Sequence, residues 1–257
     1  MSTPVTALDL SPANGTAPRT RRILRHAAME ARLVARNGEQ LLLALVIPIG
    51  LLIGQAVVGP RFGIEREPFA ASVLALGLWS TGFTSLAVAT AFERRYGVLE
   101  RLAATPLRRV DLIAGKATAF TGLALAQSAV LVIAALVAGW APRPTLAQTL
   151  IAAAATLLAL VAFACLALIL ASLASAELTL GVANLIYLAG AALGLMVPPA
   201  GFPSWAQPVL SLLPTTALGE TLRTWASGGT DPLPLAVLTV WVATGLWLAR
   251  KVFRWTS

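Results

Sequence analysis

Six long apolar segments, separated by shorter polar ones, dominate the pattern of hydrophobic and polar positions along this chain. A helix needs about 20 residues to cross a bilayer, and we interpret each segment as one span. The predicted spans cover residues 40–58, 69–91, 112–139, 146–174, 179–197 and 234–248. We therefore expect an all-α membrane protein with a single transmembrane domain over residues 21–257, preceded by a disordered tail over residues 1–20.

Residues 20–37 mix basic and apolar positions at helical spacing before the first span. The basic ones are Arg21, Arg22, Arg25, His26, Arg32 and Arg36. Such a pattern is typical of a helix that lies in the interface, with its apolar face toward the lipid. We expect an N-terminal amphipathic surface helix here, on the inner side of the membrane.

Residues 198–231 interrupt the rhythm of spans with five prolines and two tryptophans. No run in this stretch is long enough to cross a bilayer, yet much of it is too apolar for an exposed loop. We expect two short re-entrant helices between spans five and six, dipping into the outer leaflet. Ser204 is the expected cap of the first, and Thr215 or Thr216 the expected cap of the second.

Composition agrees with a chain that is solvated mainly by lipid. Apolar residues make up 58% and charged residues 12%, about half the charged share of a soluble domain. With the N-terminus in the cytoplasm, most of the 19 basic residues fall on the inner side, as the positive-inside rule requires. This explains the net charge of +8 without nucleic acid. We expect a multi-pass protein of the plasma (inner) membrane with both termini cytoplasmic.

The segment from Phe92 to Val110 is the most charged part of the chain between its two ends. Its five arginines would cost roughly 15 kcal/mol at the centre of a bilayer, so it must lie in water. The spacing predicts an amphipathic cytoplasmic helix with Tyr96, Leu99 and Leu102 on one side. Thr105 is the expected cap of the next helix, with Pro106 at its first position.

This segment resembles the coupling helix of ATP-binding-cassette (ABC) type 2 permeases, which joins their second and third spans. The matching residues are Glu93, Arg94, Gly97, Leu99, Glu100, Leu102, Thr105, Pro106 and Leu107. A second match follows span five, where the run from Asn184 to Trp205 and on to Arg223 is similar to the C-terminal hallmark of the same family. The resemblance covers about residues 25–250.

The resemblance implies a half-size exporter that pairs with a second permease subunit, as a homodimer or heterodimer. Each subunit would dock a separate nucleotide-binding ATPase subunit, which would carry the ATP and Mg, so no cofactor is expected on this chain. The residues that the resemblance assigns to ATPase coupling are Glu93, Arg94, Arg95, Tyr96, Gly97, Leu99, Glu100, Arg101 and Leu102. We hypothesise that Tyr96, Leu99 and Leu102 pack into a cleft on the ATPase, while the charged side chains set its orientation.

Candidate catalytic residues are few. His26 is the only histidine and lies outside the predicted spans, which argues against histidine-based metal or triad chemistry within the membrane. Gly115-Lys116 lacks the upstream glycine of a phosphate-binding loop, and Lys116 is expected to extend to the interface. No predicted span holds a pair of acidic residues, which argues against an ion-coupled carrier. We expect a non-catalytic membrane subunit without a metal site.

The cargo is less constrained than the architecture. Largely apolar spans favour an amphipathic or lipophilic substrate such as a drug, an antibiotic or a lipid, hence a role in antibiotic transport or multidrug resistance. Three alternatives stay open: a polysaccharide exporter of the same family, an immunity permease, and an ATP-independent secondary carrier. No residue is assigned to the substrate pathway.

Overall fold

The computed structural model describes residues 17–36, 38–105 and 107–252, and over these residues every regular element is a helix. Most of the expected tail therefore lies outside the described residues. The first elements are α1 (Arg19–Arg36), α2 (Gly38–Val58), the 3₁₀ turn η1 (Gly59–Phe62), α3 (Arg66–Trp79), the π-helical turn η2 (Ser80–Ser85), α4 (Leu86–Arg95) and α5 (Val98–Ala103). They are followed by α6 (Arg109–Val137), α7 (Leu146–Leu173), α8 (Ala176–Gly190), η3 (Ala191–Leu195), η4 (Pro199–Gly201), α9 (Gln207–Ser211), α10 (Pro214–Ala226) and α11 (Leu233–Val252).

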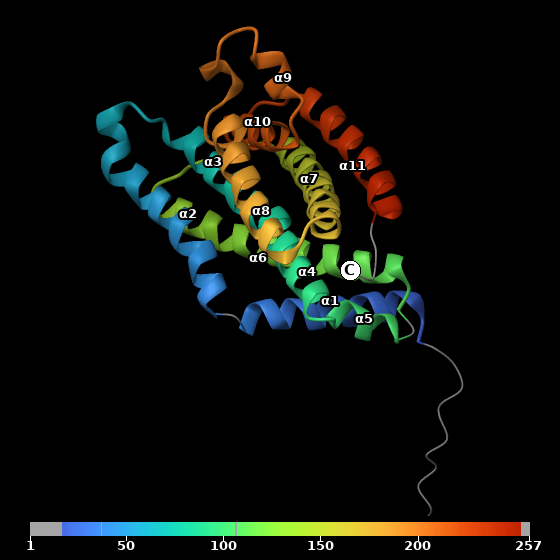
Figure 1. The fold of residues 1–257 in the computed structure, drawn as a ribbon. Coiled ribbons are helices and arrows are strands. Elements are labelled where there is room, and N and C mark those ends of the chain that lie inside the picture. Colours follow the sequence, from blue (N-terminus) through green and yellow to red (C-terminus); the bar gives the residue numbers. More distant parts are fainter. Residues whose placement is uncertain (1–16, 37, 106, 253–257) are drawn as a thin grey trace, which may run out of the picture.

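Six of these helical stretches are long and apolar enough to cross a membrane, in agreement with the sequence. They run over Ala44–Phe62, Arg66–Arg95, Val110–Val137, Leu146–Leu173, Ala176–Leu195 and Leu233–Val252. Each overlaps one predicted span. Figure 1 shows α1, α5, the start of α6 and the end of α11 at one end of the bundle, and α9 and α10 at the other.

The continuous helical stretch formed by α3, η2 and α4 is the centre of the bundle. In its most apolar stretch, 72% of the residues are buried inside the protein, a larger share than in any other span. Small residues on α3 let its neighbours approach closely: a Cβ on Gly77 would come within 2.9 Å of Leu131 of α6. Trp79 then stacks on Phe83 with ring centroids 4.3 Å apart, and Phe163 of α7 meets it edge-on at 4.6 Å.

Helix α10 lies at the end of the bundle opposite α1 and α5, where it packs mainly on α3, α7 and α11. The expected helices of this region exist as α9 and α10, but their caps were predicted wrongly. Ser204 lies in a turn before α9, and α10 begins with Pro214 rather than after a capping threonine. Proline suits a first helical position because its missing N–H would have no partner there. The depth of both helices in the bilayer stays a prediction.

Arg223 of α10 is buried, and it ties the bend after α8 to α3. Its guanidinium donates to the carbonyls of Gly194 at 2.7 Å and Leu195 at 2.6 Å, to Ser72 Oγ at 2.9 Å, and to the Glu220 carboxylate at 2.7 Å. Gly194 has φ of +133°, a backbone conformation that glycine adopts without strain. The bend leaves these backbone carbonyls without helical N–H partners, and the side chain of Arg223 donates to them instead.

Replacing Arg223 with Met should destabilise the protein by about 3 kcal/mol or more, because carbonyl and carboxylate oxygens would stay buried without donors. Thermal unfolding of the purified protein in detergent measures this as a lower Tm. The matched control is Arg61→Met, since Arg61 is exposed and its loss should leave Tm nearly unchanged. An equal Tm for both variants would contradict a structural role for Arg223.

Candidate functional site

The expected single helix through Phe92–Ala103 is broken in the structure. α4 ends at Arg95, Tyr96 is its C-cap, and Gly97 has φ of +66° before α5 begins at Val98. This left-handed conformation ends helices and is most favourable for glycine. α5 is therefore a separate short helix whose axis is set by the turn at Gly97.

The far end of α5 also differs from the expectation. The Thr105 hydroxyl donates to the carbonyl of Leu102 at 2.6 Å, at the C-terminal end of α5. α6 begins only at Arg109, and its N-cap Arg108 makes no side-chain capping bond. The prediction that Thr105 caps this helix is wrong, and Pro106 lies outside the described residues.

The three apolar residues expected on one exposed face are separated. Leu99 is only 1% exposed and belongs to the main apolar core, while Tyr96 is 63% exposed. Leu102 is partly buried against the same core. The hypothesis that Leu99 packs into a partner is therefore corrected: in this structure Leu99 anchors α5 to its own bundle.

The exposed surface of this region is formed by Tyr96, Glu100 and Arg101, which we call the α5 face. Arg101 donates weakly to the Tyr96 carbonyl at 3.4 Å, and the Arg95 guanidinium lies 5.9 Å from the centre of the Tyr96 ring. The Glu100 side chain makes no ion pair with any described residue. These three side chains are thus exposed in the part of the chain that the structure describes.

Two arginines before the break connect α4 to the turn between α7 and α8. Arg94 donates to the carbonyls of Ser172 at 2.6 Å and Ala174 at 2.5 Å, and Arg95 forms an ion pair with Glu177. The acceptors of Arg94 lie in the turn where α7 ends, so their carbonyls have no helical partner of their own. Arg94 and Arg95 thus act within the chain and fix α5 relative to a second pair of helices.

Lys116 of α6 is fully buried between two carboxylates from other helices. Its Nζ lies 2.9 Å from Oε1 of Glu30 on α1 and 2.5 Å from Oε2 of Glu93 on α4. The expectation that Lys116 extends to the interface is wrong, because these carboxylates compensate its charge inside the protein. Three helices distant in sequence meet at this ammonium group, which we call the Lys116 cluster together with Glu30 and Glu93.

His26 lies next to the Lys116 cluster, one turn before Glu30 on α1. Its ring packs on Gly115 so closely that a Cβ there would come within 2.4 Å of it. Burial lowers the pKa of His26 from its ordinary value of 6.5; the Glu30 carboxylate opposes this shift and Lys116 adds to it. His26 is therefore neutral at pH 7.

A second set of ion pairs connects α1 to the start of α6. Asp111 is fully buried and accepts from Arg19 Nε at 2.7 Å and from Arg22 Nη2 at 3.1 Å. Together with Glu30 and His26, these contacts make α1 lie along the first half of α6 (Figure 1). The sequence offered a weak signal for both groups, namely isolated charges at the ends of apolar runs, but it did not reveal the partners.

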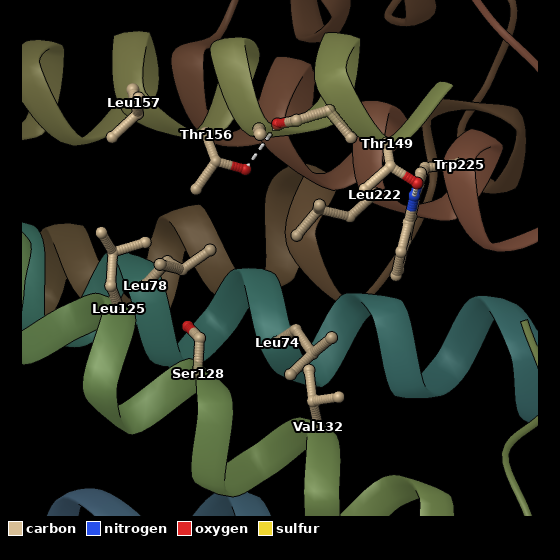
Figure 2. Close-up of a pocket in the computed structure, with 12 residues that line it drawn as sticks. Leu74, Leu78, Leu125, Ser128, Val132, Thr149, Thr156, Leu157, Leu222 and Trp225 are labelled. Atoms are coloured by element: carbon tan, nitrogen blue, oxygen red, sulfur yellow. Dashed lines mark hydrogen bonds between the residues drawn. The ribbon is translucent and has the colours of Figure 1, made fainter. Parts of the chain in front are cut away.

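One apolar groove of the bundle does not hold groups suited to catalysis. About 330 Å³ in volume, it lies between α3, α6, α7 and α10 (Figure 2). Its polar side chains are hydroxyls, of which Thr156 donates to the Ala152 carbonyl at 2.8 Å and Thr149 accepts from Trp225 at 3.2 Å. Among the described residues, no group of three His, Cys, Asp or Glu side chains is placed to hold a metal ion.

Comparison with known proteins gives one finding. A family model described as ABC-2 family transporter protein matches residues 66–251. This range runs from the start of α3 to the end of α11 and so includes α5. No curated protein sequence matches the chain.

Replacing Lys116 with Met should destabilise the protein by about 3–5 kcal/mol, because Glu30 and Glu93 would be left buried without a cation. Thermal unfolding in detergent would show a lower Tm. The triple variant Lys116→Met, Glu30→Gln, Glu93→Gln removes all three charges and should recover much of the loss. If the triple variant is less stable than the single one, the carboxylates do not depend on Lys116.

Acidification should weaken the fold through His26. Since its folded-state pKa lies below the unfolded value, the unfolded chain binds more protons as pH falls through about 6.5, and stability is lost below that pH. Tm measured from pH 7.5 to 5 should fall more steeply for the wild type than for His26→Gln. Parallel curves would contradict this role of His26.

Proposed function

Because this chain belongs to the ABC-2 family of transporter proteins, it is a membrane permease of an ABC transporter, and we propose that it exports an amphipathic or lipophilic substrate with ATP hydrolysed by a separate subunit. The family implies association with an ABC ATPase. A drug, an antibiotic or a lipid is the proposed cargo, since the spans are largely apolar. ATP and Mg would be bound by the ATPase and not by this chain.

The α5 face carries this proposal. It presents an aromatic ring just before α5 and two opposite charges on α5, a short helix whose buried side is anchored by Leu99. Interfaces use such groups in a defined way, with an aromatic residue as the buried contact and rim charges setting orientation. We propose that Tyr96, Glu100 and Arg101 contact the ATPase, whereas Glu93, Arg94 and Arg95 hold α5 in place.

Polar contacts at the end of α4 would transmit a displacement of α5 to several spans. Glu93 connects it to α6 and α1 through Lys116. Arg94 and Arg95 connect it to the end of α7 and the start of α8. Charge-assisted hydrogen bonds of this kind are short and directional, so they favour movement of these helix ends as one unit. We propose that ATP-driven closure of the ATPase acts on the bundle by this route.

The basic residues at the same end of the molecule support a proposal for the orientation in the membrane. α1, α5 and the C-terminal turn of α11, with Arg250 and Lys251, lie at one end of the bundle (Figure 1). The positive-inside rule assigns such an end to the cytoplasm, where an ATPase has access to ATP. We propose that both termini are cytoplasmic in the plasma membrane and that two permease subunits pair there.

Charge reversal at Glu100 tests the proposal. Glu100→Lys should lower ATP-driven transport about tenfold or more, because the exposed carboxylate would be replaced by a charge that the ATPase surface repels. The tagged protein is purified in mild detergent, partners are identified by mass spectrometry, and ATPase activity and cargo movement are measured in proteoliposomes.

The matched control is Glu65→Lys, which makes the same change on an exposed side chain just before α3, far from α5 in the chain. It should leave transport unchanged. Equal transport by the wild type and Glu100→Lys, with equal ATP turnover and Tm, would refute the assignment of the α5 face. Transport in vesicles without any ATPase would refute the ATP-driven exporter itself.

A further inference from the structure

Helix α2 contains a proline, Pro48, in its interior. Proline has no backbone N–H, so it cannot bond to the carbonyl four residues before it, as other helical residues do. That carbonyl belongs to Ala44. Ala44 lies at the start of a candidate membrane span, where a carbonyl without a partner costs free energy. A donor from elsewhere is therefore needed at this turn of α2.

Gln127 of α6 supplies that donor. Its Nε2 donates to the Ala44 carbonyl at 2.9 Å, from 83 positions away in the chain. At the other end of the same amide, the hydroxyl of Thr81 in η2 donates to Oε1. A backbone carbonyl only accepts and a hydroxyl can donate, so the two contacts together fix which way the amide points. Gln127 thus connects the proline turn of α2 to the π-helical turn of the central span.

The central span provides both the contact and the space for this amide. Thr156 and Thr239 donate to the carbonyl four residues earlier in their own helices, as helical threonines commonly do. Thr81 instead donates across to α6, and it is 7% exposed. Gly77 of α3 leaves room for the amide, since a Cβ there would come within 3.2 Å of Gln127 Nε2.

The packing of α2 differs on the two sides of Pro48. After it, Leu52 and Gln55 are buried, and Gln55 donates to the Ile64 carbonyl at 3.1 Å, so this part of α2 is held against the bundle. Before it, the turn that contains Ala44 borders a groove of about 260 Å³ between α1, α2, η2 and α6. No described side chain fills this groove, so the turn has room to shift while the rest of α2 stays packed.

We infer that α2 is hinged at Pro48 and that the Gln127 side chain is a latch that holds the hinge in the position that the structure shows. Proline is a common cause of sharp helix bends, because it removes one bond from the helical ladder. Gln127 replaces that bond with one from another helix. Its release would let the two parts of α2 change their angle while the central span stays fixed. Because α1 ends at Arg36 and α2 begins at Gly38, a displacement of α1 would reach this hinge directly.

Hydrogen–deuterium exchange of the purified full-length protein in detergent tests the latch. Gln127→Met removes the donor and nearly keeps the size of the side chain. It should speed amide exchange over residues 44–58 about fivefold, the effect of losing one net hydrogen bond in a local opening reaction. The matched control is Gln148→Met, since Gln148 also donates an amide proton to a backbone carbonyl, that of Gly228. It should leave exchange over residues 44–58 within about twofold of the wild type. Equal exchange in the two variants would overturn the latch.

A double-mutant cycle with Pro48→Ala tests whether Gln127 serves the proline. Alanine restores the N–H at position 48, so the Ala44 carbonyl regains its helical partner. Gln127→Met should lower Tm by roughly 3 °C or more in the wild type, and by less than about half as much in the Pro48→Ala background. Equal losses of Tm in both backgrounds would overturn the inference.

The two measurements are independent of each other and of transport. If Pro48→Ala does not fold, the exchange rates of Gln127→Met and Gln148→Met decide the proposal by themselves. No ATPase is present in either experiment, so neither result depends on the proposed transport function.

Discussion

The burial of Lys116 between Glu30 and Glu93 is the interaction that organises the end of the bundle where α1 and α5 lie. An ammonium group cannot stay in a dry interior by itself, so it requires carboxylates, and these come from two other helices. Satisfying one charge thus brings α1, α4 and α6 together. Hydrophobic contact alone would not do this as selectively, because apolar faces in lipid have little preference for one another over acyl chains.

At the opposite end of the bundle, a buried cation again compensates buried oxygens, but here most of those oxygens are backbone carbonyls. There the problem is a bend after α8, whose carbonyls lose their helical partners, and the buried guanidinium of Arg223 supplies donors to them. Between the two ends, α3 and η2 rely on small residues and close aromatic contacts. The bundle therefore has a tightly packed apolar middle, closed at each end by a specific polar arrangement.

The spans were predictable from sequence because the bilayer itself imposes their length and apolar character. The break at Gly97 was not, since Tyr96, Leu99 and Leu102 keep a helical spacing across a residue whose left-handed conformation leaves no trace in that spacing. Lys116 was misjudged for another reason: a lysine near a span end usually extends to water. Its partner Glu30 lies 86 positions away in the chain, and no local pattern reports such a pairing.

This separation has a consequence for how the protein is made. Glu30 leaves the ribosome 86 residues before the lysine that will neutralise it, which at typical synthesis rates is an interval of roughly 4 to 17 s. During that time the ion pair that holds Glu30 in the folded protein cannot form. The N-terminal helix is thus synthesised first, but its contact with Lys116 can form only after the start of the third span has been synthesised.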